Sequence, residues 1–166
     1  MTERAAAPGG LALVEALVNT LSIDTGEDRL AGTFALSGDE LARTAELREA
    51  LRAACLAHAG QDMPPEAAEA LTWLLSAAPL VLTVDEEGGA TLSPAGPAGL
   101  TARIAAAIAT AVMDGTWERL KACEAEDCRW AYYDRSPAGR SRWCTMSVCG
   151  SRAKMRTYRA RRAAKP

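Results

Sequence analysis

The chain holds a single histidine and a single phenylalanine among its 166 residues, and it has no long apolar run. One histidine excludes metal sites built on two imidazoles, and the sequence shows no nucleophile with a partner base, so we expect that the protein is not an enzyme. The longest apolar stretch, residues 104–113, is far shorter than the ~20 residues that span a bilayer. The N-terminus makes a poor secretory signal because Glu15 interrupts the first apolar run, so we expect a cytoplasmic protein without membrane contact.

Charge is almost balanced over the whole chain, with a formal net of −2, but it is distributed unevenly. Residues 1–115 hold 6 Lys+Arg against 16 Asp+Glu, a net of −10, whereas residues 116–166 hold 13 against 5, a net of +8. The length fits one domain of ~100–200 residues, or one domain with a small module. We therefore predict an acidic domain over 1–115 and a basic module over 116–166, whose charge favours an anionic partner such as nucleic acid.

Apolar residues recur at helical spacing through most of the acidic part. Ser37 and Glu40 form the pattern of a capping box, which predicts the start of a helix of about 20 residues that stops at Gly60. Within this helix we interpret Cys55 as a small core residue and His58 as a helix-end side chain whose positive charge is favoured by the dipole. Other elements are predicted at 11–21 (helix), from 64–65 to before residue 79 (helix), at 80–84 with 90–92 (β-hairpin) and at 100–113 (helix). The expected fold is α+β and mainly helical, with a small β-hairpin.

Four of the five cysteines lie in the last 44 residues, as two Cys-x-x-x-x-Cys pairs with fifteen residues between them. The pairs are Cys123 with Cys128 and Cys144 with Cys149. An odd number of cysteines in a reducing compartment argues for a metal or free thiols over a disulfide framework. Four thiolates close a tetrahedral shell around zinc, so we predict one structural Zn²⁺, with iron or a redox dithiol as the alternatives.

Aromatic residues gather around these cysteines, since six of the eight in the chain follow residue 115. We predict two strands, 129–134 and 141–143, joined by a turn at 136–139. The aromatic side chains would then build the small core of the module. Because side chains alternate along a strand, only one of Tyr132 and Tyr133 is expected to face inward, which leaves the other available for stacking on a base.

The chain after Cys149 is strongly basic and is predicted to form a helix capped by Ser151. Met155 and Tyr158 are expected to anchor this helix to the zinc core, and one face of it would hold Arg152, Arg156 and Arg159. A helix of this kind neutralises phosphates and fits a major groove, where arginine contacts guanine edges. The predicted nucleic-acid-binding residues are Arg140, Arg142, Arg152, Lys154, Arg156, Arg159, Arg161 and Arg162.

The basic module resembles a known family in the segments 119–123, 128–130, 133–134, 141–146, 149–154 and 158–159. Together these segments resemble the CGNR zinc finger, which is named for a Cys-Gly-Asn-Arg sequence that is Cys-Gly-Ser-Arg at 149–152 here. The resemblance implies a four-cysteine finger that binds DNA. Residues 11–110 are similar, in their opening segment 11–21 and in element order, to the ABATE domain that accompanies this finger. That similarity implies a bacterial, stress-linked transcriptional regulator.

Two classes of function remain open for this sequence. The first is a DNA-binding transcriptional regulator whose partner is double-stranded DNA. The alternative is an RNA- or protein-binding zinc module without sequence-specific DNA recognition, because arginine-rich helices also dock on RNA and on acidic partners. For the acidic domain, a small-molecule effector, a homodimer and contact with another protein all stay open.

Overall fold

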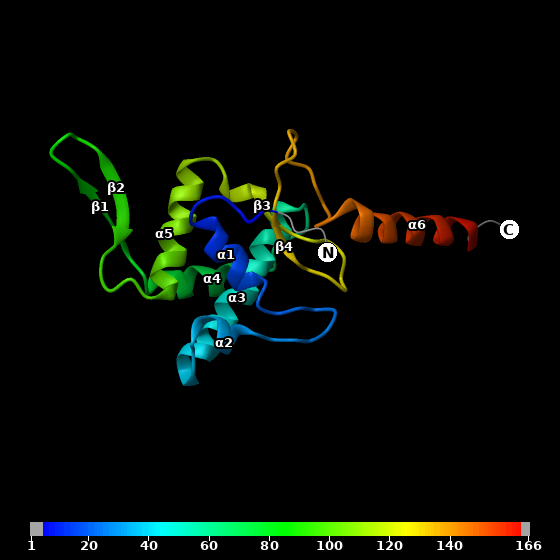
Figure 1. The fold of residues 1–166 in the computed structure, drawn as a ribbon, viewed down its shortest axis with the longest axis horizontal. Helices are drawn as coiled ribbons and strands as arrows, with labels where there is room; N and C mark the ends of the chain where they lie inside the picture. The colour runs from blue at the N-terminus through cyan, green and yellow to red at the C-terminus, as the bar shows by residue number, and fades with distance from the viewer. Residues whose placement is uncertain (1–4, 164–166) are drawn as a thin grey trace.

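The computed structural model describes residues 5–163 of the chain (Figure 1). The fold is α+β and mainly helical, as the apolar periodicity predicts. The helices are α1 (Leu11–Val18), α2 (Leu30–Phe34), α3 (Gly38–His58), α4 (Pro65–Ser76), α5 (Leu100–Met113) and α6 (Ser151–Ala163), with a 3-10 turn η1 (Trp117–Arg119) and a π-helical turn η2 (Met146–Gly150). The strands are β1 (Leu80–Val84), β2 (Ala90–Pro94), β3 (Leu120–Ala122) and β4 (Ala131–Tyr133). No helix within residues 5–163 combines the length and the apolar content that crossing a bilayer requires.

The helices of the acidic part lie close to where the apolar spacing places them. The predicted helix over 100–113 is confirmed as α5, and α4 has Pro65 in its first turn, where the missing N–H costs no hydrogen bond. The first helix ends at Val18, before the predicted end at Leu21, because Leu21 instead forms an isolated antiparallel bridge with Asp28. The short helix α2 was not predicted.

The capping box predicted at the start of α3 does not form. Ser37 occupies the N-cap position with an extended backbone, but its side chain makes no capping hydrogen bond. The residue that follows, Gly38, has φ of 55°, so the chain turns sharply between the hydroxyl and the first helical turn. The predicted end of the helix is confirmed: α3 stops at His58, and Gly60 adopts the left-handed φ of 102°.

The hydrophobic core lies among α1, α3 and α5 and continues into the sheet formed by β3 and β4. Val14 of α1, Leu51 of α3 and Ile104 of α5 are fully buried in one cluster. The same cluster includes, from the sheet, Leu120, Ala122, Ala131 and Tyr133. One core therefore contains residues from both sides of the predicted boundary at residue 115. The division into 1–115 and 116–166 stays a prediction.

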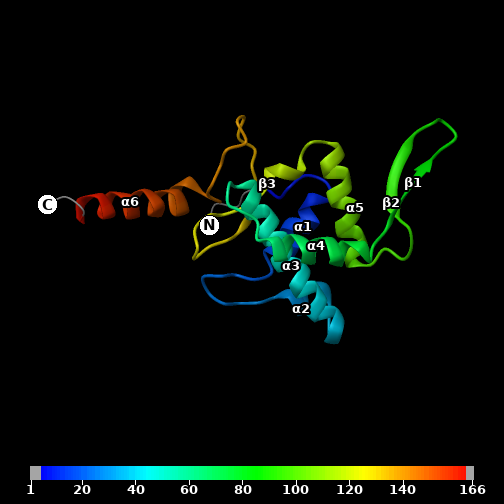
Figure 2. The same cartoon turned by 180° about the vertical axis from the view of Figure 1, so that it is seen from behind.

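Two elements stand away from this core, at opposite ends of the long axis of the molecule (Figure 1, Figure 2). One is the β1–β2 hairpin, which pairs antiparallel, with Leu82 opposite Leu92 as the predicted strands require. The other is α6, which extends from the end that contains β3 and β4. The basic helix is thus held far from the hairpin and close to the cysteine-bearing segments.

The second sheet differs from the predicted one, because β4 pairs with β3 and not with residues 141–143. Ser141 donates its backbone N–H and its hydroxyl to the Asp134 carboxylate, at 2.8 and 2.9 Å. These bonds curl the chain into a loop directly after β4, so residues 141–143 do not lie alongside it as a strand.

Both tyrosines of β4 are buried, with Tyr132 1% and Tyr133 9% exposed. The reason is that this small sheet is covered on both faces. Tyr133 joins the main core, whereas the Tyr132 hydroxyl donates to the Ser141 carbonyl oxygen at 2.7 Å beneath the loop. The prediction that one of the two is free to stack on a base is therefore wrong.

Candidate metal centre and basic helix

Four cysteine sulfurs meet beyond the end of the second sheet. The Sγ atoms of Cys123, Cys128, Cys144 and Cys149 all lie within 4.8 Å of one another. The Cys144 sulfur is 3.6 Å from that of Cys128 and 3.6 Å from that of Cys149. A tetrahedral shell with Zn–S distances of ~2.3 Å places its sulfurs about 3.8 Å apart, so the donor set and its spacing fit one zinc ion.

A tight turn brings the first pair of ligands together. Cys123 directly follows β3, and the chain turns back through hydrogen bonds from the N–H groups of Cys128 and Arg129 to the Ala125 carbonyl, at 2.9 and 3.1 Å. Arg129 has φ of 51°, in the left-handed region that residues with a side chain seldom adopt. This backbone reversal returns the chain to β4 while the Cys128 sulfur stays beside that of Cys123.

The second pair is brought together by η2, where little space is left beside Gly150. A Cβ atom on Gly150 would lie 3.0 Å from the Sδ atom of Met146 and 3.3 Å from Cδ1 of Trp143. Trp143 packs against the cluster formed by the cysteines, beside Cys149. The glycine of the 149–152 motif therefore leaves room for the Met146 and Trp143 side chains next to the cysteine cluster.

The four thiols affect one another's ionisation because they are so close. Hydrogen bonds from Cys128 and Cys144 lower the pKa of Cys123 to about 2. The contact with Cys123 raises the pKa of Cys128 to about 12. Contacts with Cys123 and Cys128 raise the pKa of Cys144. Burial raises the pKa of Cys149. One thiolate is thus favoured and further ones are opposed, and a divalent cation is what allows all four to ionise.

A buried carboxylate holds the loop that leads to Cys144. Asp134, at the end of β4, is 1% exposed and accepts hydrogen bonds from the N–H groups of Ser136 and Ser141 at 3.0 and 2.8 Å. Burial opposes the charge of Asp134, but the hydrogen bonds from Ser136 and Ser141 outweigh it and hold its pKa well below the usual value. The loop is fixed at Ser141, three residues before the ligand.

The helix that follows the metal ligands projects into solvent. None of the residues of α6 is buried, and α6 continues directly from the last residue of η2. Ser151 does not cap the helix, because helical turns already begin at Met146, and its hydroxyl instead donates to the Met146 carbonyl at 3.1 Å. Met155 and Tyr158 are 50% and 54% exposed, so the prediction that they anchor α6 to the zinc core is wrong.

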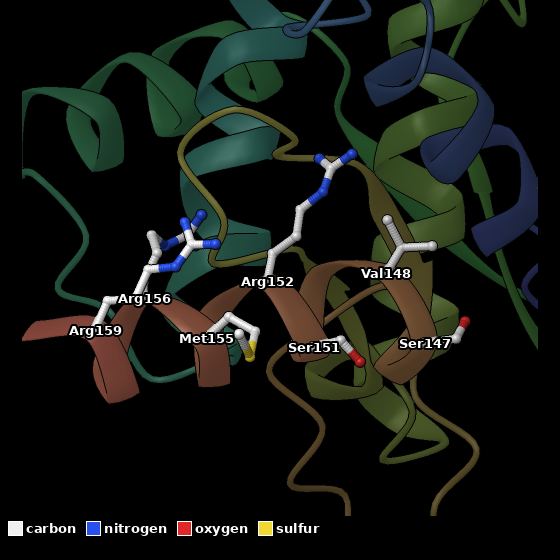
Figure 3. Close-up of a pocket in the computed structure, with 7 residues that line it drawn as sticks. All are labelled: Ser147, Val148, Ser151, Arg152, Met155, Arg156 and Arg159. Carbon is white, nitrogen blue, oxygen red and sulfur yellow. The ribbon is translucent and has the colours of Figure 1, made fainter. Parts of the chain in front are cut away.

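Three of the predicted nucleic-acid-binding residues line one groove along α6 and η2 (Figure 3). The groove is formed by Ser147, Val148, Ser151, Arg152, Met155, Arg156 and Arg159. Arg152 also approaches an acidic neighbour, since its Nη1 atom is 3.6 Å from Oδ2 of Asp127. The groove thus gathers arginines that are four and three residues apart, as the predicted helical face requires.

The other predicted nucleic-acid-binding residues lie outside this groove. Four of them are exposed: Lys154, Arg161 and Arg162 lie elsewhere on α6, and Arg140 lies in the loop that leads to Cys144. Arg142 donates to both carboxylate oxygens of Glu124, each at 2.5 Å, and its guanidinium lies 5.5 Å from the centre of the Trp143 ring. Arg142 therefore connects the two ligand-bearing segments, and its contact with DNA stays a prediction.

His58 lies at the end of α3 as predicted, but in a different electrostatic role. Burial lowers its pKa, and its Nδ1 atom is 2.7 Å from the Leu120 carbonyl oxygen. A carbonyl can only accept, so Nδ1 carries the proton and the neutral ring bridges α3 to β3. Favourable interaction of a charged ring with the helix dipole is therefore not its role. Cys55 is fully buried and burial raises its pKa to about 12, which confirms it as a core residue.

Several buried polar residues that join the helices to the cysteine-bearing segments were not predicted from the sequence. Arg48 and Arg52 of α3 are only 4% and 5% exposed. Each directly follows a leucine of the core. Asn19, directly after α1, also bonds to β4. Two arginines four residues apart beside apolar positions are the signal that would have found the first two, since buried arginines need acceptors from other elements.

This geometry defines the region as a four-cysteine zinc module from which a basic helix extends. Residues 119–162 match the family model of the CGNR zinc finger. The matched segment contains all four cysteines, which are placed to hold a single structural Zn²⁺. No curated protein matches the chain.

Proposed function

We propose that the protein is a DNA-binding transcriptional regulator that presents α6 to double-stranded DNA. The observation that carries this proposal is a basic helix that follows directly after a four-cysteine metal site. Figure 1 shows this helix, α6, extending away from the rest of the molecule. α6 has 13 residues, with the sequence SRAKMRTYRARRA, and none of them is acidic. The major groove of DNA, about 12 Å wide, admits an α-helix of this kind.

The groove that contains Arg152, Arg156 and Arg159 supports contact with phosphates and bases. Each arginine that neutralises a phosphate releases counterions, which favours binding. A guanidinium also matches the O6 and N7 atoms of guanine with two hydrogen bonds. Ser147 lines the same groove and offers its hydroxyl group to a phosphate oxygen, whereas the Ser151 hydroxyl is already donated to the Met146 carbonyl.

We assign a regulatory role to the acidic part of the chain. Residues 11–110 are proposed to form an ABATE-like domain that senses a small-molecule effector, forms a homodimer or contacts another protein. The resemblance described above supports a stress-linked regulator in the bacterial cytoplasm. We propose no enzymatic activity for either part.

Mobility-shift titration of duplex DNA with the full-length protein tests the proposal. Affinity should fall steeply between about 50 and about 200 mM salt, and the slope of log affinity against log salt should shrink by about 0.9 for each phosphate contact removed. The test variant is Arg156→Gln with Arg159→Gln. The control is Arg103→Gln, which removes an exposed charge from α5, outside the finger, and should leave the slope unchanged. Absence of binding at about 50 mM salt, or binding that is insensitive to salt, would contradict the proposal.

Competition separates DNA binding from the alternative of an RNA- or protein-binding module. Labelled duplex DNA is displaced by unlabelled duplex, by structured RNA or by an acidic polypeptide, each at equal charge concentration. A DNA-binding regulator should be displaced most readily by duplex DNA. Displacement at lower concentrations by RNA or by the polypeptide would favour the alternative instead.

A further inference from the structure

The N-terminal helices contact the segment that carries the first pair of zinc ligands. Arg52 of α3 donates from Nη1 to the Arg129 carbonyl oxygen at 2.9 Å. The Asn19 side chain bonds to the backbone of Ala131 twice: its Oδ1 accepts from the N–H at 2.8 Å and its Nδ2 donates to the carbonyl at 3.0 Å. Both contacted residues lie within three positions of Cys128.

Arg129 is the point at which the backbone after Cys128 needs support. Its left-handed φ of 51° is unfavourable for a residue with a side chain, so the surrounding contacts must hold it in place. Its carbonyl is bound by Arg52, its guanidinium donates to the Gln61 side chain at 3.0 Å and its N–H donates to Ala125. Two of these three contacts come from outside the finger.

Arg52 is itself rigidly held. It is 5% exposed, its Nη2 donates to the Val18 carbonyl at 2.8 Å and its Nε donates to the Glu49 carboxylate at 3.0 Å. The planar guanidinium thereby joins the end of α1, its own helix α3 and the turn after Cys128 in one fixed geometry. Asn19 contacts the chain two residues further on, at Ala131 of β4. Its side chain bonds to both the N–H and the carbonyl of Ala131, as a neighbouring strand would do.

We propose that Arg52 and Asn19 are positioning residues for the zinc site. By fixing the backbone of Arg129 and Ala131, they hold the Cys128 turn in the conformation that directs its sulfur toward the other three. The affinity for zinc therefore depends on helices that lie outside the matched zinc-finger segment. This inference concerns metal binding and is independent of whether α6 binds DNA.

Metal binding by full-length variants tests this role of Arg52. Zinc affinity is measured by competition with a chelator of known affinity, and the site geometry by the visible absorption of bound Co²⁺. Arg52→Met should retain the spectrum of a tetrahedral thiolate site but bind zinc about 10- to 100-fold more weakly, the range found for residues that orient metal ligands. Arg52→Lys, which keeps the charge and one donor group, should recover part of this affinity.

Arg48→Met is the matched control. Arg48 lies one turn earlier on α3 and is equally buried, but its hydrogen bonds go to Thr20, Asp28 and Glu49. Both variants lose a buried arginine, and circular dichroism establishes the conditions in which each is folded. Zinc affinity of Arg48→Met should fall much less than that of Arg52→Met, because Arg48 makes no hydrogen bond to the finger and is linked to it only through Glu49, which Arg52 also binds. Equal loss of zinc affinity in the two variants would overturn the proposal.

A second pair of variants tests Asn19 by the same measurements. Asn19→Ala removes both bonds to Ala131, whereas Thr20→Val alters the adjacent buried side chain, whose hydroxyl bonds to Leu17 and Arg48. Asn19→Ala should weaken zinc binding and speed the loss of Co²⁺ to chelator, and Thr20→Val should change neither. If Asn19→Ala binds zinc as tightly as Thr20→Val does, Asn19 has no positioning role.

Discussion

Lys121 and Asp134 form an ion pair that is almost completely shielded from water, with Nζ and Oδ2 3.2 Å apart and side-chain exposures of 5% and 1%. The Lys121 ammonium also donates to the Gly139 carbonyl oxygen at 2.5 Å. The two charges, one from β3 and one from the end of β4, therefore close the loop that leads to the third zinc ligand. A pair this buried is stable only when further hydrogen bonds offset the loss of hydration, and Ser136 and Ser141 provide them for the carboxylate.

Asp134→Asn is expected to destabilise the protein by about 3 kcal/mol, because it leaves the Lys121 ammonium buried without a counter-charge. Combining it with Lys121→Met should cost less than the sum of the two single variants, since neither charge then remains. Urea denaturation of the zinc-loaded proteins near neutral pH measures these free energies of unfolding. A cost below about 1 kcal/mol for Asp134→Asn would show that the pair behaves like one at the surface.

His58 should give the protein a pH dependence that His58→Gln lacks. Burial lowers the pKa of His58 below 6.5, so between the folded value and 6.5 the unfolded chain binds more protons. The stability that the neutral ring contributes is therefore complete above about pH 6.5 and is lost as the pH falls through the folded pKa. Glutamine keeps a donor for the Leu120 carbonyl but does not titrate. The free energy of unfolding should thus fall more steeply with acidification in the wild type, and parallel curves would contradict this.

The helices and the metal ligands follow from local patterns in the sequence. The spacing of apolar residues in 100–113 defines α5 because a helix that packs on one side repeats its buried positions every three or four residues. The four cysteines identify the zinc site because only cysteine supplies thiolate ligands. The two cysteines of each pair are also close enough in sequence to meet across one turn. In both cases the pattern that predicts the structure lies within the segment that forms it.

The pairing of β3 with β4 could not be predicted in the same way. Three-residue strands carry no usable alternation, and here the two faces of the sheet are both buried. Their place is set by contacts distant in sequence, such as Asn19 with Ala131 and His58 with Leu120. The failure of Met155 and Tyr158 to pack has a related cause, because helical spacing does not say whether another element is present to cover that face.

Removing zinc is expected to destabilise the helical core as well as the finger. Leu120 and Tyr133 belong to the same buried cluster as Leu51, so loosening β3 and β4 exposes part of that core. Thermal unfolding followed by far-UV circular dichroism should show a single transition that moves to lower temperature when a chelator is added. A helical transition unchanged by the chelator would instead show that residues 1–115 and 116–166 are independent units.

Arg142 and Arg156 should differ in what they contribute, although both are predicted to bind nucleic acid. Arg142 is paired with Glu124, so contact with a phosphate requires breaking that pair, whereas Arg156 lies in the open groove. Arg156→Gln is therefore expected to weaken DNA binding more than Arg142→Gln does. Mobility-shift titrations at one fixed salt concentration compare the two variants. Equal or greater weakening by Arg142→Gln would show that the loop before the third ligand is the main contact surface.

Asp127 is expected to restrain the first arginine of the groove, because its carboxylate lies 3.6 Å from Arg152. DNA phosphates must compete with this carboxylate for the guanidinium. Asp127→Asn should therefore tighten binding to duplex DNA, by up to about fivefold given the ~1 kcal/mol limit for exposed pairs.

The control for Asp127→Asn is Glu126→Gln, which removes the same charge from the adjacent exposed residue. Point variants are used because β3 and β4 are part of the main core, so a fragment without α1 and α3 would lose the packing of Leu120 and Tyr133. If the acidic neighbour acts through Arg152, Asp127→Asn tightens binding more than Glu126→Gln, and the difference shrinks as salt screens the pair. Equal effects of the two variants would show that only the loss of one negative charge matters and that Arg152 is not restrained.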